Sequence, residues 1–281
     1  MKVVVTGVKG QLGHDLEKQL TARNHQVFGI DRNELDITDE AKVQAYFDEV
    51  KPDAILHCAA FTNVDAAEED KETAYNVNAL GPKYLAQAAN KVGAKMVYVS
   101  TDYVFDGTAT EPYEVEHPTN PLGVYGETKF AGEEFLKQNL DRYFIVRTAW
   151  VFGINGNNFV KTMLRLAEDR NELGVVHDQV GSPTYTVDLA RFIIDLVESE
   201  KYGVYHATNE GVCSWYDFAV EIFKQAGVDI KVNPLTSDQF PRPAARPNYS
   251  VLSKKKITEQ GFTLLPDWHE ALSAYLKELK G

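Results

Sequence analysis

The first half of the chain alternates regularly between short apolar runs and amphipathic stretches. The apolar runs are rich in β-branched residues and cover residues 2–7, 26–31, 54–60, 95–101 and 143–153. Continuous apolar strands that alternate with helices indicate a parallel sheet covered on both faces. We therefore predict an α/β protein with a doubly wound parallel sheet. Ligands of such sheets lie beyond the carboxyl ends of the strands.

The regular alternation loosens after about residue 152. Helical runs are expected at 158–170, 187–199 and 214–227, with short strands between them. A proline-rich segment that bears arginines, residues 240–250, interrupts the end of the chain. The second half is thus expected to be a different, more mixed unit that packs on the first.

These patterns predict two domains. Residues 1–152 are expected to form a Rossmann-type domain that binds a dinucleotide, with residues 184–206 returning to it. Residues 153–281 are expected to form mainly a smaller α/β domain that binds the substrate. A cleft between the two parts is the expected ligand site.

Charge and composition narrow the class of partner. The 281 residues carry 29 Lys and Arg against 41 Asp and Glu, a formal net charge of −12. Because nucleic acid and anionic membranes attract basic surfaces, neither is expected as the main partner. The two cysteines, Cys58 and Cys213, lie far apart in no metal-like spacing and are expected to be reduced thiols, so no metal site is assigned.

The ends of the chain and its hydropathy bear on location. The strand-like run begins at Lys2, which leaves no room for a signal peptide in this sequence. No apolar stretch approaches the roughly 20 residues that a membrane-spanning helix needs. We expect a cytoplasmic protein.

Three glycines follow the first strand. The stretch VVVTGVKGQLG, residues 3–13, places Gly7, Gly10 and Gly13 at a strand-to-helix turn. Glycine permits the tight turn and lets a pyrophosphate approach the bare backbone, while the helix N-terminus offers free N–H groups and a positive dipole end. With a strand before it and a helix after it, the pattern predicts a dinucleotide site.

The second strand ends at two charged residues of opposite sign. Asp31 is placed to accept hydrogen bonds from an adenosine ribose, which favours NADH, and Arg32 is placed to bind a 2′-phosphate, which favours NADPH. Both cofactors therefore stay open. Asp36 and Ile37 are expected beside the adenine, and the small residues that end the third strand, near Ala60, would let the cofactor lie close.

A second motif supplies chemistry for carbonyl reduction. The fourth strand ends in Ser100 and Thr101, whose side chains alternate across the strand, so that one hydroxyl is expected to face the ligand. Tyr125 and Lys129 lie one helical turn apart on the same face. Tyr125 would protonate a carbonyl oxygen, and a nearby Lys129 ammonium would lower the pKa of that tyrosine by favouring the phenolate.

With these residues in view, the chain resembles the extended short-chain dehydrogenase/reductases, whose signature is Gly-x-x-Gly-x-x-Gly with Tyr-x-x-x-Lys. Within them it resembles the dTDP-4-dehydrorhamnose reductases. The stretches that carry this likeness are GQLG, STDYVFDG, YGETKFAGE, RTAWVFG, DQVGSPTYTVDLA and RPNYSVL. They run from the start of the chain to about residue 253.

The resemblance implies roles for individual positions. The catalytic set would be Thr101, Tyr125 and Lys129, and the latter two would also contact the cofactor. Further cofactor contacts would fall on residues of the glycine turn and of the ends of the second and third strands: Gly10, Gln11, Leu12, Asp31, Asp36, Ile37, Ala60, Phe61 and Thr62. Substrate contacts would fall on Thr101, Asp102 and Trp150.

The arginines of PRPAARPNYS form a local cationic cluster in an acidic protein, which suggests a diphosphate clamp. The resemblance favours Arg246 over Arg242 for this contact. The sequence also departs from the family. Phe61 stands where a tyrosine is frequent, and Tyr249 and Val251 lie in a stretch that is usually more polar.

The implied activity is NADPH- or NADH-dependent reduction of the C4 carbonyl of dTDP-4-dehydro-L-rhamnose to give dTDP-L-rhamnose. One alternative is a sugar-nucleotide epimerase or dehydratase of the same superfamily, which would keep its cofactor bound. Another is a non-catalytic binding subunit similar to the regulatory subunit of methionine adenosyltransferase. The resemblance also leaves a homodimer open.

Overall fold

The computed structural model describes residues 1–280. Its centre is a sheet of six parallel strands in the order β10-β5-β4-β3-β1-β2. The strands are β1 Lys2–Thr6, β2 Gln26–Ile30, β3 Ala54–His57, β4 Lys95–Thr101, β5 Tyr143–Thr148 and β10 Gly203–His206. The predicted α/β fold with a doubly wound parallel sheet is thereby confirmed. The order of the strands reverses between β1 and β3, and such a switch point is where ligands bind in sheets of this kind.

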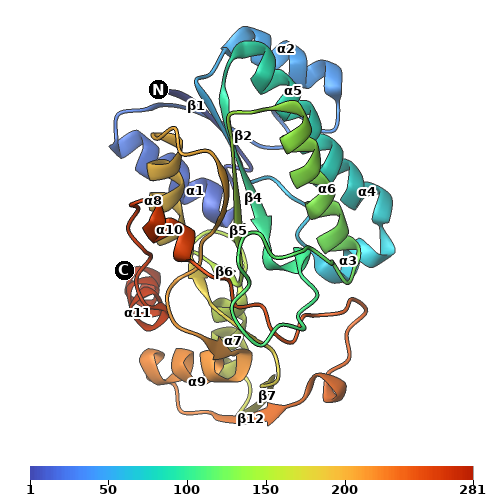
Figure 1. Cartoon of the computed structure of the whole chain (residues 1–281). Coiled ribbons are helices and arrows are strands. Elements are labelled where there is room, and N and C mark those ends of the chain that lie inside the picture. The colour runs from blue at the N-terminus through green and yellow to red at the C-terminus, as the bar shows by residue number, and fades with distance from the viewer. Residues whose placement is uncertain (281) are drawn as a thin grey trace.

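Helices cover both faces of the sheet (Figure 1). On one face lie α2 Glu40–Val50, α5 Gly81–Val92 and α6 Val124–Asn139. On the other face lie α1 Gln11–Ala22 and α8 Thr186–Val197. Asp39 caps α2, because its side chain accepts a hydrogen bond from the backbone N–H of Lys42 at 3.1 Å.

The connection after β3 is more elaborate than the sequence pattern indicates. It contains two short helices, α3 Val64–Glu69 and α4 Lys71–Tyr75, followed by a π-helical turn, η1 Asn76–Leu80, that runs into α5. A 3₁₀ turn, η2 Asp102–Val104, follows β4 directly. Both connections lie at the carboxyl end of the sheet, where the ligand is expected.

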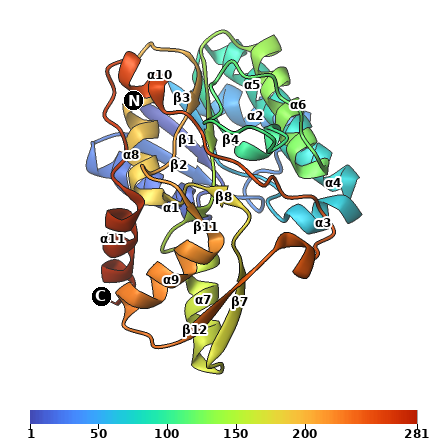
Figure 2. The ribbon, with the colours of Figure 1, turned by 60° about the horizontal axis from the view of Figure 1, so that its bottom comes forward.

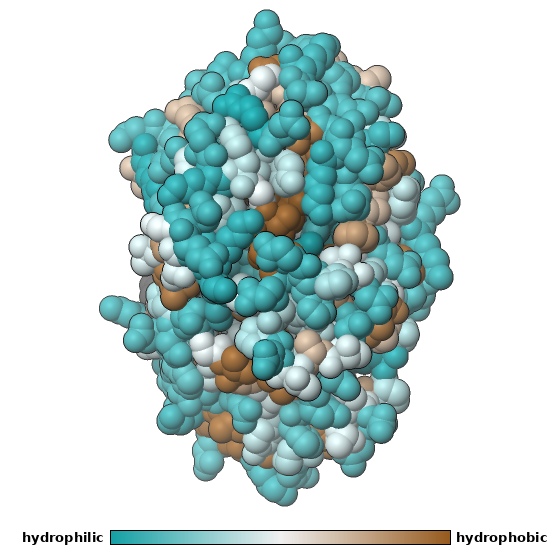
Figure 3. Space-filling view, viewed as in Figure 1, coloured by the Kyte–Doolittle hydropathy of each residue, from teal (hydrophilic) through white to brown (hydrophobic). Residues whose placement is uncertain are grey.

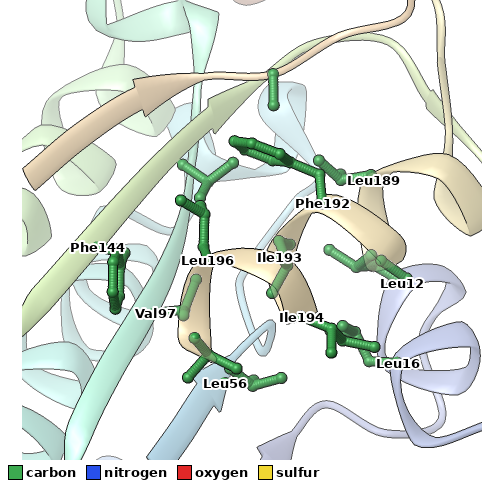
Figure 4. Close-up of a cluster of buried hydrophobic side chains, with 14 of the residues drawn as sticks. Leu12, Leu16, Leu56, Val97, Phe144, Leu189, Phe192, Ile193, Ile194 and Leu196 are labelled. Carbon is green, nitrogen blue, oxygen red and sulfur yellow. The ribbon is translucent and has the colours of Figure 1, made fainter. Parts of the chain in front are cut away.

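Figure 4 shows the core between the sheet and the helices α1 and α8. Leu12 and Leu16 of α1 and Ile193 of α8 pack there against the sheet residues Leu56 and Val97. All but Leu12 are completely buried, and Leu12 is 7% exposed. Since α8 comes from residue 186 onward, the second half of the chain completes the core of the first.

The remaining elements form a smaller layer at the bottom of Figure 1. Its strands pair two by two, β6 with β9, β7 with β12 and β8 with β11. These strands are β6 Val151–Phe152, β7 Glu172–Val176, β8 Val180–Gly181, β9 Thr184–Tyr185, β11 Cys213–Ser214 and β12 Lys231–Leu235. The helices of this layer are α7 Phe159–Glu168, α9 Trp215–Ala226, α11 Trp268–Lys280 and the 3₁₀ turn η3 Ser237–Gln239. The short helix α10 Lys255–Glu259 lies outside this layer, beside α8 (Figure 1). An aromatic-rich core holds this layer together.

The structure differs from the expected strand at 143–153. The chain leaves the sheet after Thr148, and β6 pairs with β9 outside it. The interruption falls at Trp150, which has a φ of 48°, a value that breaks an extended strand. Trp150 therefore lies at the junction between the large sheet and the smaller layer.

Residues beyond 206 also return to the first part of the molecule. Ile257 of α10 and Leu265 join the core that α8 forms with the sheet. The last third of the chain thus alternates between the two parts, as Figure 2 shows for the segment between β12 and α10.

The face of the molecule shown in Figure 3 is largely hydrophilic. Figure 3 shows small, separate apolar patches on the face that it presents. No helix in residues 1–280 has the length and apolar character required to cross a membrane.

Candidate active site

The glycine turn lies at the switch point of the sheet. Gly7 has a φ of 68°, and a Cβ atom there would lie 2.8 Å from the backbone nitrogen of Ala59. A Cβ on Gly13 would lie 2.2 Å from the carbonyl oxygen of Gly7. Side chains at either position would therefore collide with backbone. The turn, the helix behind it and the end of β3 are packed as closely as a pyrophosphate cradle requires.

The N-terminus of α1 has the properties of an anion site. Gly10 is its N-cap and provides no side-chain cap, and the first turn contains no acidic residue. The first N–H groups of the helix thus keep their capacity to bind an anion, and the helix dipole adds to it. The residues of this turn fit the pyrophosphate of a dinucleotide.

The side chain of Gln11 is directed away from the glycine turn. Its Oε1 accepts hydrogen bonds from the backbone N–H of Gly153 at 2.9 Å and from Nδ2 of Asn158 at 3.0 Å. Leu12 is buried in the core beside the sheet. If these two residues contact the cofactor as predicted, they do so through their backbone, and their side chains hold α1 to the rest of the molecule.

The end of β2 carries Asp31 and Arg32, the two residues predicted to decide between NADH and NADPH. The carboxylate of Asp31 forms an ion pair with Lys9 of the glycine turn and accepts a hydrogen bond from the N–H of Asn33 at 2.7 Å. Hydrogen bonding with the Glu34 carboxyl group, with Lys9 and with the N–H of Asn33 holds the pKa of Asp31 well below its usual range. Asp31 is therefore ionised at neutral pH. Arg32 beside it is exposed, so both charges are present at the carboxyl end of β2.

The next predicted cofactor residues differ in their surroundings. Asp36 is exposed and accepts two hydrogen bonds from Thr38, whereas Ile37 is 8% exposed and packs in the core with α2 and α5. Phe61 is held at both its N–H and its carbonyl by the side chain of Asn78, at 2.8 Å and 3.1 Å. Ala60 is half-buried and Thr62 is exposed. Asn78 of the π-helical turn thus fixes the loop after β3, where the cofactor is expected.

Tyr125 and Thr101 lie together at the end of β4. Burial raises the pKa of Tyr125 to about 12, the hydroxyl of Thr101 opposes this by hydrogen bonding, and the charge of Asp102 adds to it. The ring of Tyr103 packs edge-on against that of Tyr125, with 5.4 Å between the centroids. Tyr125 is therefore a neutral phenol at neutral pH and still holds its proton.

The ammonium group of Lys129 is directed at β4. Its Nζ donates to the carbonyl of Val99 at 2.8 Å and lies 4.0 Å from the ring centroid of Tyr98. Burial lowers the pKa of Lys129 to about 7, and the nearby Glu133 and Cys58 oppose this. The lowering of the pKa of Tyr125 by Lys129 stays a prediction, and in this structure the hydroxyl of Thr101 opposes the raised pKa.

A continuous set of contacts leads from Thr101 to Trp150. The hydroxyl of Thr101 donates to Asp102 at 2.9 Å, and the side chain of Ser250 lies close enough to lower the pKa of the same carboxyl group. A Cβ on Gly181 would lie 2.8 Å from both the Ser250 hydroxyl and the indole of Trp150. The structure therefore brings Asp102 and Trp150 into one region, although the chain separates them by almost fifty residues.

Asp102 has the environment of a functional carboxyl group. It is 2% exposed, and its Oδ2 has no hydrogen-bond partner in the described residues. Burial raises the pKa of Asp102 to about 6, and the side chains of Thr101 and Ser250 oppose this. An unpaired buried carboxylate oxygen costs free energy unless a ligand donates to it. A sugar hydroxyl is a suitable donor.

Trp150 has a partner that the sequence pattern did not indicate. Its indole stacks on that of Trp215 at the start of α9, with 3.6 Å between the centroids and 12° between the planes. Trp150 is half-buried. The stacked pair makes a stiff aromatic wall at the junction of the two parts of the molecule.

A buried ion pair supports the helix that bears Tyr125 and Lys129. Glu133 accepts from Arg147 of β5 at 2.9 and 2.7 Å and from the hydroxyl of Ser100 at 2.6 Å. Glu133 is fully buried and Arg147 is 2% exposed. Ser100 thus faces α6, and Thr101, the next residue, is left for the site. The spacing of Glu133, four residues after Lys129, would have suggested a pair between those two residues, and no local pattern indicates Arg147 as the partner.

Arg246 is bound by a carboxylate of the first part of the molecule. Its guanidinium donates to both oxygens of Asp65 in α3, at 2.6 and 2.9 Å. Arg242 lies 3.8 Å from the same carboxylate. The two arginines are brought together as the sequence suggested, but around Asp65, which nothing in the sequence pattern singled out.

The chain is similar to known proteins over nearly its whole length. The family described as the RmlD substrate binding domain matches residues 1–280. A dTDP-4-dehydrorhamnose reductase of Aggregatibacter actinomycetemcomitans is 44% identical, over 96% of this chain and 97% of its own. A dTDP-4-keto-6-deoxy-D-glucose reductase of Streptomyces niveus is 42% identical, over 96% of this chain and 94% of its own.

Two solved structures superpose over nearly the whole chain. A dTDP-4-dehydrorhamnose reductase of Clostridium acetobutylicum is 49% identical with a TM-score of 0.99 and full coverage of both chains. A dTDP-4-dehydrorhamnose reductase of Bacillus anthracis, in complex with NADP, is 45% identical with a TM-score of 0.97, over 99% of this chain and 100% of its own.

Proposed function

This chain belongs to the dTDP-4-dehydrorhamnose reductase family, and from that premise we propose that it reduces dTDP-4-dehydro-L-rhamnose to dTDP-L-rhamnose with NADPH or NADH. The observation that carries the proposal is the placement of a protonated Tyr125 beside the hydroxyl of Thr101 at the carboxyl end of β4. A neutral phenol next to a second hydroxyl is what a ketone oxygen needs as it gains negative charge.

The residues at the switch point would hold the cofactor. Gly7, Gly10 and Gly13 would receive the pyrophosphate at the N-terminus of α1, and Asp31 or Arg32 the adenosine ribose. The loop that Asn78 fixes would lie along the dinucleotide. NADPH supplies a hydride to C4 of the sugar when it is bound.

The other chemistry belongs to the chain itself. Thr101 and Tyr125 hydrogen-bond the C4 carbonyl oxygen, and Tyr125 transfers its phenolic proton to that oxygen as C4 is reduced. Lys129, whose Nζ donates to the carbonyl of Val99 in β4, would bind the nicotinamide ribose, and its positive charge, when present, would stabilise the phenolate left on Tyr125.

The dTDP-sugar would lie between the two parts of the molecule. Asp102 would accept a sugar hydroxyl at its unpartnered oxygen, and Trp150 would provide a flat wall. Accordingly, residues 1–152, with residues 184–206 returning to them, would bind the cofactor, and most of residues 153–281 would bind the nucleotide sugar. The cytoplasmic location and the homodimer stay predictions.

A different 4-keto sugar is the second candidate, because a relative at 42% identity is a dTDP-4-keto-6-deoxy-D-glucose reductase. The two sugars differ in ring stereochemistry, which changes few contacts. An enzyme discriminates between two such similar substrates by the ratio of their kcat/KM values.

The test is cofactor oxidation, followed by absorbance, with each 4-keto sugar generated in situ. We expect stoichiometric oxidation with dTDP-4-dehydro-L-rhamnose that falls about 100- to 10,000-fold in Tyr125→Phe. Tyr103→Phe, a change in the ring that packs on Tyr125, is the matched control and should keep most of the activity. Folded protein that oxidises neither cofactor with this sugar would reject the proposal. Retention of the cofactor on the protein, with no reduction of the sugar, would favour an epimerase.

A further inference from the structure

Donors of the segment 240–250 converge on the carboxylate of Asp65. Arg246 binds both oxygens, the backbone N–H of Ala244 donates to Oδ1 at 3.2 Å, and Arg242 lies 3.8 Å from Oδ2. Figures 1 and 2 both show this segment, between β12 and α10, running beside α3. Segments almost 180 residues apart in sequence are thus joined through one side chain.

The geometry of these donors is that of an anion site. A guanidinium fork with a converging backbone N–H binds phosphate oxygens in the same way as carboxylate oxygens. The carbonyl of Ala244 accepts from Nη1 of Arg246 at 2.7 Å, which holds the fork in place. The side chains of Arg246 and Asp65 are 19% and 26% exposed, so a ligand can reach the pair.

The pair lies close to the proposed catalytic tyrosine. The ring of Tyr103 packs on that of Tyr125, and the pKa of Tyr103, which burial raises, is also affected by the charges of Asp102, Arg246 and Asp65. The segment that bears Arg246 continues to Ser250, which is paired with β8 by a 2.8 Å hydrogen bond from its N–H to Val180. The fork is therefore at the edge of the region that holds Asp102 and Trp150.

We propose that Asp65 occupies the diphosphate subsite as an internal competitor, and that the diphosphate of the nucleotide sugar displaces it from Arg246, Arg242 and the N–H of Ala244. This inference rests on the proposed function, because it takes the diphosphate to be that of the dTDP-sugar. It goes further in assigning a role to Asp65. With Asp65 in place, its negative charge neutralises the guanidinium of Arg246. A ligand that displaces Asp65 must therefore carry more negative charge and accept more hydrogen bonds than a single carboxylate.

Such a competitor weakens the apparent binding of the ligand. The apparent Kd equals the intrinsic Kd divided by the fraction of molecules in which Arg246 is free of Asp65. Removing the charge of Asp65 should therefore strengthen diphosphate binding. From the usual strength of a partly exposed ion pair, we expect the gain to be about two- to fivefold.

The experiment measures the Kd of dTDP and of inorganic diphosphate by calorimetry for the wild type, Asp65→Asn and Asp65→Ser. Two different substitutions are used so that a folding defect in one does not decide the result, and thermal unfolding is recorded for both. Glu69→Gln is the matched control, because Glu69 is an exposed carboxylate of the same helix. Arg246→Gln in the Asp65→Asn background should abolish the gain.

Tighter binding of both probes by the Asp65 variants, with Glu69→Gln unchanged, is the expected result. Unchanged or weaker binding by both folded Asp65 variants would overturn the inference and would make Asp65 a group that orients Arg246 for its ligand. Neither probe is reduced, so this outcome is independent of turnover. Failure of the reductase assay with normal diphosphate binding would reject the proposed function alone.

Discussion

Glu133 and Arg147 form a two-bond ion pair inside the protein, with Nε of Arg147 2.9 Å and Nη2 2.7 Å from the carboxylate oxygens of Glu133. The pair joins α6 to β5, and the hydroxyl of Ser100 adds a bond from β4. It thereby fixes the helix that carries Tyr125 and Lys129 relative to the strand that ends at Thr101. The carbonyl of Val115 and the ring of His206 lie 3.3 and 3.4 Å from the other guanidinium nitrogen, so the loop before α6 is tied in as well.

Glu133→Gln should be strongly destabilising, because it leaves the buried guanidinium of Arg147 without a counter-charge. Breaking a buried pair on one side costs about 3–5 kcal/mol of the free energy of unfolding. Urea unfolding measures this. Glu134→Gln, at the exposed neighbouring position that bonds Lys137, should change the free energy of unfolding by less than about 0.5 kcal/mol. Equal effects of the two substitutions would contradict the assignment.

Gly13→Ala should disrupt the glycine turn, since its Cβ would lie 2.2 Å from the carbonyl oxygen of Gly7. We expect a loss of about 1–3 kcal/mol in the free energy of unfolding from this overpacking, measured without cofactor. Gly10→Ala is the control, because the nearest atom to its Cβ would be 3.1 Å away and its φ is −80°. It should cost less than about 1 kcal/mol. A reversed order would show that the turn is not packed as described.

Lys129 should make stability depend on pH. Its pKa is lowered from 10.5 to about 7 by burial, so between these values the unfolded chain binds a proton that the folded protein does not. The wild type should therefore become more stable relative to Lys129→Met as pH rises from 7.5 to 9, at about 1.4 kcal/mol per pH unit. Below pH 7 the difference should be constant. A difference that does not change with pH would mean that Lys129 stays charged throughout.

The patterns of strands, helices and glycines in the sequence predicted the sheet and the turn correctly, because both depend on local residue order. The residues that complete the site could not be found in this way. Asp65 meets Arg246 across 181 positions and Gln11 meets Gly153 across 142. Trp150 and Trp215 also meet only through the tertiary fold, so no local pattern indicates their contact.

Asp31 should disfavour a 2′-phosphate, because it is ionised and lies beside the expected ribose site. Asp31→Asn should raise the ratio of kcat/KM for NADPH to that for NADH by about five- to tenfold, since a like charge is removed. Arg32→Gln should lower the same ratio. Initial rates with both cofactors give these ratios. Ratios that stay equal to that of the wild type in both variants would place the adenosine ribose elsewhere.

The most direct test follows the hydride that reduces C4 of the sugar while Tyr125 supplies the proton. It uses NADPH in which deuterium replaces both hydrogens at C4 of the nicotinamide ring. Mass spectrometry and NMR of the product are expected to find one deuterium at C4 of dTDP-L-rhamnose for each oxidised cofactor released, and Tyr125→Phe should form this product at a severely reduced rate. Product without deuterium at C4, or an unchanged rate in Tyr125→Phe, would contradict the account.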